Sequence, residues 1–167
     1  MTYTSTKTYG PSEGLAVCYR QWRADRKSGK SQGEPYPRQE IPGCCALHGY
    51  ALTFYFEFKS ETLDARNWVV DFGSLRPLKE FIKESFDHTM IVAADDPHHA
   101  VFVNLHELGL AKMVEVENTG CEALAKFMLE YCNEIFLPEH YPNGDQVIRC
   151  SKVEVRETPS NSAFYEE

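Results

Sequence analysis

The stretch ALTFYFEF, residues 51–58, alternates large apolar side chains with smaller or more polar ones and is typical of a half-buried β-strand. Its apolar members occupy every second position and therefore share one face of the strand: Leu52, Phe54, Phe56 and Phe58. Such a face is stabilised only when other apolar groups cover it. The stretch therefore predicts a sheet with one face buried against further elements.

Two later stretches carry apolar side chains at helical spacing and would lie on one face of that sheet. Ser74 can cap the first helix, which tolerates Pro77 in its first turn; its stripe comprises Leu75, Leu78, Phe81, Ile82 and Phe86. The second helix begins at Thr119, which forms a capping-box pattern with Glu122, and Pro138 marks its end. Its stripe comprises Leu124, Phe127, Met128, Tyr131 and Ile135.

Several shorter stretches complete the expected order of elements. Residues 15–22 could form a strand, and residues 146–157 alternate with a phase slip near Ser151, which predicts a strand pair or a bulged strand. A shorter helix is possible within residues 93–112, and residues 113–116 could be extended. The order predicts an α+β fold, in which an antiparallel sheet carries two helices on one face.

The length of 167 residues predicts a single domain spanning residues 1–167. Residues 23–43 are rich in glycine, proline, serine and charge, which predicts a long loop. Connections of that length often have a functional role. The basic residues in its first part could steer an anionic substrate or could simply be solvated: Arg23, Arg26, Lys27 and Lys30.

The charge and the composition exclude several classes of partner. A net charge of -8, from 25 acidic and 17 basic residues, disfavours general binding to nucleic acid or to anionic lipid. The sequence has no apolar run near the roughly 20 residues that cross a bilayer, and its start lacks the pattern of a secretory signal. We therefore expect a cytoplasmic protein whose six cysteines are reduced.

Two short motifs match functional sites by letters alone. Asp71-Phe72-Gly73 matches a kinase metal motif, but the rest of the kinase signature is missing. His98-His99 follows Asp95-Asp96, yet neighbouring side chains point to different sides, so a solvated polar loop is the expected structure. Neither motif is assigned a chemical role.

Five pieces of the chain occur in the order of one known family: CCALHGY (44–50), WVVDFGSLRPL (68–78), SFDHTM (85–90), GCEALAKFMLEY (120–131) and VRETPSNSAFY (155–165). From about residue 15 to residue 165 the sequence resembles the 6-pyruvoyltetrahydropterin and 6-carboxytetrahydropterin synthases. The resemblance implies the tunnelling fold, with a four-stranded antiparallel sheet and two helices in each subunit. It also implies a homo-oligomer, a trimer or a hexamer of stacked trimers, with active sites between subunits.

The resemblance implies a carbon–oxygen lyase acting on 7,8-dihydroneopterin triphosphate, from which triphosphate is eliminated while the side chain is rearranged. The 6-pyruvoyl and 6-carboxy products both remain open. So do the two kinds of pathway, one leading to a modified nucleoside such as queuosine and the other to a reduced pterin cofactor.

Four residues match functional positions of that family. Cys44 matches the catalytic base, and a histidine partner would stabilise its thiolate. Asp87 and His88 match the pair that supplies this partner, the carboxylate orienting the imidazole. Glu157 matches the carboxylate that binds the amino-pyrimidine edge of the pterin. The structural alternatives are a small buried thiol at Cys44, a turn cap at Asp87-His88 and a surface carboxylate at Glu157.

The zinc site of the family is altered in this chain. The three zinc-binding histidines of the family correspond here to Tyr19, His48 and Tyr50. Zinc in a catalytic site normally takes three protein ligands, and a phenol must lose a proton of pKa near 10 to become one. Cys18 and Cys45 lie one residue away from the matching positions and would face the opposite side. The alternative function is therefore a catalytically silent or altered pterin-binding protein without the usual zinc.

Overall fold

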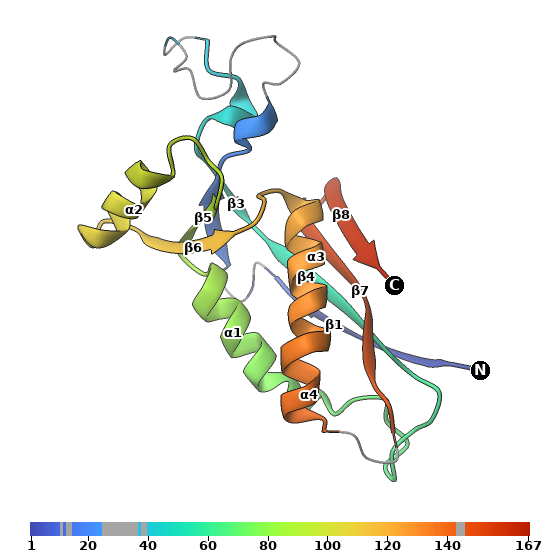
Figure 1. The fold of residues 1–167 in the computed structure, drawn as a ribbon. Coiled ribbons are helices and arrows are strands. Elements are labelled where there is room, and N and C mark those ends of the chain that lie inside the picture. Colours follow the sequence, from blue (N-terminus) through green and yellow to red (C-terminus); the bar gives the residue numbers. More distant parts are fainter. Residues whose placement is uncertain (11, 13–14, 25–36, 38–39, 143–145) are drawn as a thin grey trace.

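The structure is a computed structural model that describes residues 1–10, 12, 15–24, 37, 40–142 and 146–167. These residues form two four-stranded sheets and a set of helices (Figure 1). The predicted α+β class, with a four-stranded antiparallel sheet that carries helices, is confirmed. Most of the predicted loop at 23–43 lies outside the described residues, so that prediction stays open.

The larger sheet is entirely antiparallel and has the order β1-β4-β7-β8. Its strands are β1 (Tyr3–Tyr9), β4 (Thr53–Ser60), β7 (Arg149–Thr158) and β8 (Asn161–Glu166). The alternation predicted for residues 51–58 is confirmed, because Leu52, Phe54, Phe56 and Phe58 are each 0% exposed. Strand β1 had not been predicted.

The phase slip predicted near Ser151 is a β-bulge. Glu57 pairs with Lys152 and Phe58 pairs with Cys150, so Ser151 has no residue opposite it in β4. The Ser151 hydroxyl donates to the backbone carbonyl of Glu57 at 3.3 Å. The bulge shifts the alternation by one residue and returns the following apolar side chains to the buried face.

Helices α1 (Arg76–Phe86) and α3 (Cys121–Tyr131) lie side by side over one face of this sheet (Figure 1). The two helices meet through Phe81 and Tyr131, whose rings stack with centroids 3.7 Å apart. A π-helical turn (Cys132–Phe136) then leads into α4 (Leu137–His140). Pro138 therefore does not end the helical segment but lies in the first turn of α4, where its missing N–H is tolerated.

Both predicted helix caps are wrong in detail. Ser74 lies within a 3₁₀ turn (Phe72–Leu75), and the carboxylate of Asp71 caps that turn by accepting from the amide of Gly73 at 2.8 Å. No side chain caps the start of α3, where Gly120 is the N-cap residue. The Thr119 hydroxyl instead donates to the carbonyl of Arg20 at 2.7 Å, because a distant strand end lies beside it.

The second sheet has the order β3-β2-β5-β6 and had not been predicted as a separate sheet. Its strands are β2 (Ala16–Tyr19), β3 (His48–Ala51), β5 (Thr89–Ala93) and β6 (Lys112–Val116). Strand β5 pairs in parallel with both β2 and β6, and helix α2 (His99–Glu107) connects β5 to β6. The strands expected within 15–22 and 113–116 and the short helix within 93–112 are confirmed.

The acidic residues before α2 are more than a solvated loop. Asp96 is buried and lies 2.9 Å from the guanidinium nitrogen Nε of Arg20. Asp95 forms an ion pair with Arg23 and accepts from the indole of Trp22 at 3.2 Å. These contacts fix the end of β2 against the turn after β5. No helix in the described part of the chain is long and apolar enough to cross a membrane.

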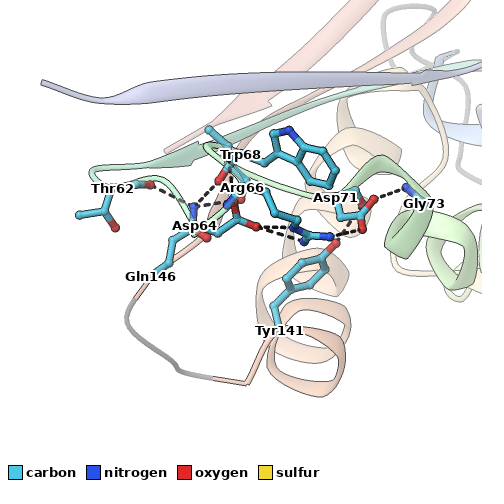
Figure 2. A network of polar contacts seen from close by, with 9 residues as sticks. Thr62, Asp64, Arg66, Trp68, Asp71, Gly73, Tyr141 and Gln146 are labelled. Carbon is cyan, nitrogen blue, oxygen red and sulfur yellow. Dashed lines mark hydrogen bonds and ion pairs between the residues drawn. The ribbon is translucent and has the colours of Figure 1, made fainter.

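A polar network holds the segment between β4 and α1 (Figure 2). Arg66 lies between two carboxylates, at 3.0 Å from both Asp64 and Asp71, and its guanidinium stacks on the ring of Trp68. The side-chain amide of Gln146 donates to three backbone carbonyls of the segment, including that of Trp68 at 3.0 Å. Asp71 of the kinase-like motif therefore has a structural role.

We expect the Phe56→Ala substitution to lower the free energy of unfolding by about 3–5 kcal/mol, because it leaves a cavity in the fully buried face of β4. Chemical denaturation measures this loss. Val101→Ala, at a position of α2 that is 56% exposed, is the control and should change stability by less than about 0.5 kcal/mol. Equal losses in the two variants would contradict the packing described here.

The pH dependence of stability should reflect the same polar network. The backbone amide of Trp68, followed by that of Arg66 and its guanidinium, lowers the pKa of Asp64. Its stabilisation is therefore present above the unfolded pKa near 4 and is lost as the pH falls through the lower folded value. In Asp64→Asn the difference in unfolding free energy between pH 6 and about pH 2.5 should be smaller than in the wild type. Glu107→Gln, at the exposed end of α2, removes the same charge as a control, and an equal reduction there would contradict the assignment.

Candidate functional site

Three aromatic side chains cluster on one face of the β2–β3 ladder. Tyr19 pairs directly with His48, and Tyr50 lies two residues further along β3, so the three side chains share a face. The ring centroids are 5.3 Å apart for Tyr19 and His48, 5.2 Å for His48 and Tyr50, and 5.8 Å for Tyr19 and Tyr50. The positions matched to the zinc ligands of the family therefore come together.

Glu157 of the other sheet joins this cluster. In the β7–β8 ladder Arg156 pairs with Ser162 and Thr158 pairs with Asn161, so Glu157 is the extra residue of a bulge. A bulge turns its side chain away from the regular alternation. The Tyr19 hydroxyl donates a hydrogen bond to the Oε1 atom of Glu157. Glu157, the predicted pterin-binding carboxylate, is therefore held by Tyr19, which occupies one of the three positions matched to the zinc ligands.

This hydrogen bond and the burial around it keep Tyr19 protonated. Its side chain is 0% exposed, and burial, followed by the hydrogen bond to Glu157, raises the pKa of the Tyr19 phenol far above its usual value. Burial also raises the pKa of the Tyr50 phenol, and the charge of Glu157 adds to the effect. Both phenols are therefore neutral hydrogen-bond donors near neutral pH.

Cys121 is a member of the site that sequence reasoning missed. It is buried at the start of α3, where burial, followed by the charge of Glu157, raises the pKa of its thiol to about 12. Gly120 lets the start of α3 lie close to Gln21. Its φ is 108°, and an added Cβ would lie 2.7 Å from the side-chain amide nitrogen of Gln21. No local pattern distinguishes Cys121 from an ordinary core cysteine in the sequence.

Cys44 lies at the outer edge of the cluster. It belongs to a short 3₁₀ turn (Gly43–Cys45), and its carbonyl accepts from the amide of Gln21 at 2.8 Å, which fixes the turn beside the end of β2. The side chain is exposed and lies close enough to Tyr50 for their charges to interact. The alternative of a small buried thiol is wrong for Cys44, although it applies to its neighbour Cys45.

Asp87 and His88 immediately precede β5 and lie beside the opposite end of β2. His88 Nδ1 is 2.8 Å from Asp87 Oδ1, and the imidazole is 81% exposed with a backbone φ of 53°. The next residue pairs with Val17, whereas Cys44 contacts Gln21. Val17 and Gln21 are four residues apart, which is at most about 13 Å along an extended chain. Within one copy Asp87–His88 and Cys44 therefore lie beside opposite ends of β2.

The residues at the three metal positions do not fit a zinc ion. A phenol binds zinc well only as a phenolate, whereas the buried Tyr19 hydroxyl keeps its hydrogen in a bond to Glu157. His48 has Nδ1 at 2.7 Å from the carbonyl of Ala46, which leaves only Nε2 as an acceptor. Cys18 packs with Met90 and Val92 in a separate apolar cluster, so it faces away as expected. Within the described ranges, no three acidic, cysteine or histidine side chains group to hold a metal.

Of the predicted basic residues of the loop, the structure describes Arg23. Arg23 is bound to Asp95 and Asn118, and it lines a cavity of about 310 Å³ with Gln21 and Thr119. The other three basic residues of the prediction, Arg26, Lys27 and Lys30, lie outside the described residues. Their steering of an anionic substrate stays a prediction.

Comparison with known proteins gives a consistent assignment. The family model described as 6-pyruvoyl tetrahydropterin synthase matches residues 30–167. The 6-carboxy-5,6,7,8-tetrahydropterin synthase of Aquifex aeolicus is 26% identical over 170 residues, covering 100% of this chain and 99% of that protein.

Solved structures share the fold along the whole chain. The uncharacterized protein WS1659 from Wolinella succinogenes has a TM-score of 0.73 at 22% identity, with 99% of this chain and 98% of that chain covered. The 6-pyruvoyl tetrahydropterin synthase of Caenorhabditis elegans has a TM-score of 0.59 at 15% identity, with 100% and 96% covered. Since the family model matches well over half of its residues, the chain belongs to the 6-pyruvoyl tetrahydropterin synthase family.

Proposed function

We propose that the protein binds 7,8-dihydroneopterin triphosphate, or a close dihydropterin relative, beside Glu157 and catalyses proton transfers at the pterin side chain. The observation that carries this proposal is the bulge in β7, which turns Glu157 into the cluster of Tyr19, His48 and Tyr50. A carboxylate can accept two hydrogen bonds from the amino-pyrimidine edge of a pterin. Glu157 is the residue that we assign to this contact.

The proton transfers are assigned to Cys44 and to the Asp87–His88 pair. Cys44 is exposed next to Tyr50, where its thiolate can take a proton from a bound side chain. Asp87 holds Nδ1 of His88, so Nε2 can exchange a proton with the thiol or with the substrate. The triphosphate leaves with the electron pair of its carbon–oxygen bond, and the proton that Cys44 has taken must then pass to His88 or back to the substrate so that the thiolate is regenerated.

The placement of the two groups favours a site built from two copies of the chain. Since Cys44 and the Asp87–His88 pair lie beside opposite ends of β2 within one copy, we infer that a reaction that uses both combines Cys44 of one copy with the pair of a second. Strands β1 and β8 are the outer strands of the antiparallel sheet, and each can pair with a strand of another copy. We propose a homo-oligomer, a trimer or a hexamer, on this basis.

A second candidate function is pterin binding without the lyase reaction. The presence of phenols at two of the three metal positions favours it, since elimination of triphosphate benefits from a Lewis acid at the side-chain oxygens. Measured release of triphosphate from 7,8-dihydroneopterin triphosphate separates the two candidates, because only the enzyme releases it.

Substitutions of Glu157 and Cys44 should separate binding from turnover. We expect Glu157→Gln to weaken binding of 7,8-dihydroneopterin triphosphate about 10- to 100-fold, since a hydrogen bond to a charged group is lost. Cys44→Ser should leave the Kd within about threefold and reduce turnover at least about 100-fold. Calorimetry and triphosphate release measure the two effects. Glu154→Gln, on the same strand, is the control, and a wild type that neither binds nor turns over the compound would reject the proposal.

Mixing two inactive variants tests the shared site. Cys44→Ala and His88→Ala should each be inactive, whereas dissociating and reassembling them as an equal mixture should restore about a quarter of the wild-type activity. A quarter is expected because half of the copies keep Cys44, the other half keep His88, and random assembly places an intact Cys44 beside an intact His88 at one site in four. A mixture of Cys44→Ala with the double variant should stay inactive. Failure of the first mixture to recover any activity would place both groups in one copy.

A further inference from the structure

We propose that the cluster of Tyr19, His48 and Tyr50 works without a bound metal and that the Tyr19 hydroxyl positions the Glu157 carboxylate for its ligand. The positioning role rests on the proposed function, whereas the absence of a metal does not. The two claims share one observation, the hydrogen bond that runs from Tyr19 in β2 to Glu157 in β7.

The spacing of the rings is that of a metal centre. Three imidazoles bound to one tetrahedral zinc at about 2.0–2.1 Å per bond place their ring centroids about 5 Å apart. The centroids of Tyr19, His48 and Tyr50 are separated by 5.2–5.8 Å. The backbone of β2 and β3 therefore brings three rings to a suitable separation, and the residue types decide whether a metal binds.

The residue types oppose a metal. Tyr19 is fully buried and directs its hydrogen at Glu157, so a cation beside its oxygen would have to displace both that proton and the partner carboxylate. His48 offers one ring nitrogen, because Nδ1 faces the carbonyl of Ala46 at 2.7 Å. A single imidazole nitrogen is far short of the three protein ligands of a catalytic zinc site.

The same hydrogen bond controls the geometry of Glu157. Glu157 has no paired residue opposite it in the β7–β8 ladder, so the ladder alone does not fix the position of its side chain. Tyr19 holds Oε1 and the Cys121 thiol also hydrogen-bonds the carboxylate, whose remaining lone pairs can accept from a ligand. Tyr19 is thus a positioning residue that acts through Glu157.

Zinc content tests the first claim without any pterin. After incubation with equimolar zinc and desalting, the wild type should hold less than about 0.1 zinc per chain. Tyr19→His combined with Tyr50→His should hold about one zinc per chain, and adding His48→Ala to this double variant should remove it. One zinc per wild-type chain that is lost in His48→Ala would overturn the claim. A folded double variant that gains no zinc would overturn the argument from ring spacing.

Binding of 7,8-dihydroneopterin triphosphate tests the second claim. Tyr19→Phe keeps the ring and should weaken binding about tenfold or more. The control is Tyr9→Phe, which also removes a buried hydroxyl but one that donates to the Leu75 carbonyl outside the cluster, and it should change binding by less than about threefold. Since Tyr19 acts through Glu157, combining Tyr19→Phe with Glu157→Gln should weaken binding little more than Glu157→Gln alone. Effects that multiply would overturn the positioning role, because a purely structural change adds its own loss. If the wild type does not bind the compound, the proposed function and the positioning role both fail, and the zinc measurements still decide the first claim.

Discussion

The hydrogen bond from Tyr19 to Glu157 connects the two sheets at the point where the site forms. A buried phenol without an acceptor would cost about 1–3 kcal/mol, so the fold has to provide a hydrogen-bond acceptor at this position, and Glu157 is that acceptor. Tyr19 belongs to the mixed sheet and Glu157 to the antiparallel one, and therefore the bond also fixes how the two sheets meet. The geometry of the site and the packing of the fold are consequently set by the same contact.

The neighbouring contacts explain why the site lies at this end of β2. Thr119 binds the carbonyl of Arg20, and the positive φ of Gly120 lets α3 start against Gln21. The backbone amide of the same Gln21 donates to the carbonyl of Cys44 and so holds the turn that carries Cys44. The exposed Asp87–His88 pair lies beside the other end of β2, away from the turn that carries Cys44. The proposed reaction, which uses both ends, would therefore depend on assembly.

The sequence predicted those parts of the structure that depend on local pattern. The alternation through Phe58 and the phase slip at Ser151 both correspond to observed features, because burial on one face of a strand imposes a period of two. Strand β5 was missed since all five of its residues are buried and it has no alternation to detect. The family resemblance predicted that Tyr19 and His48 lie close together. It did not predict that the Tyr19 hydroxyl binds Glu157, which is 138 residues away in the sequence. No local pattern encodes such a contact.

Replacing two metal-binding imidazoles by phenols would put hydrogen-bond donors where lone pairs were, while the spacing of the rings would change little. An imidazole nitrogen offers a lone pair to a cation, whereas each phenol here offers a hydrogen, and the raised pKa values of Tyr19 and Tyr50 keep it in place. The Cys121 thiol, with a pKa of about 12, is a third neutral donor beside the same carboxylate. The Tyr19 hydrogen is already donated to Glu157, which leaves the Tyr50 hydroxyl as the phenol of the cluster that can donate to negative charge developing on a bound side chain. This arrangement favours reactions with modest charge development, such as proton transfer next to a carbonyl, over those that require a strong Lewis acid.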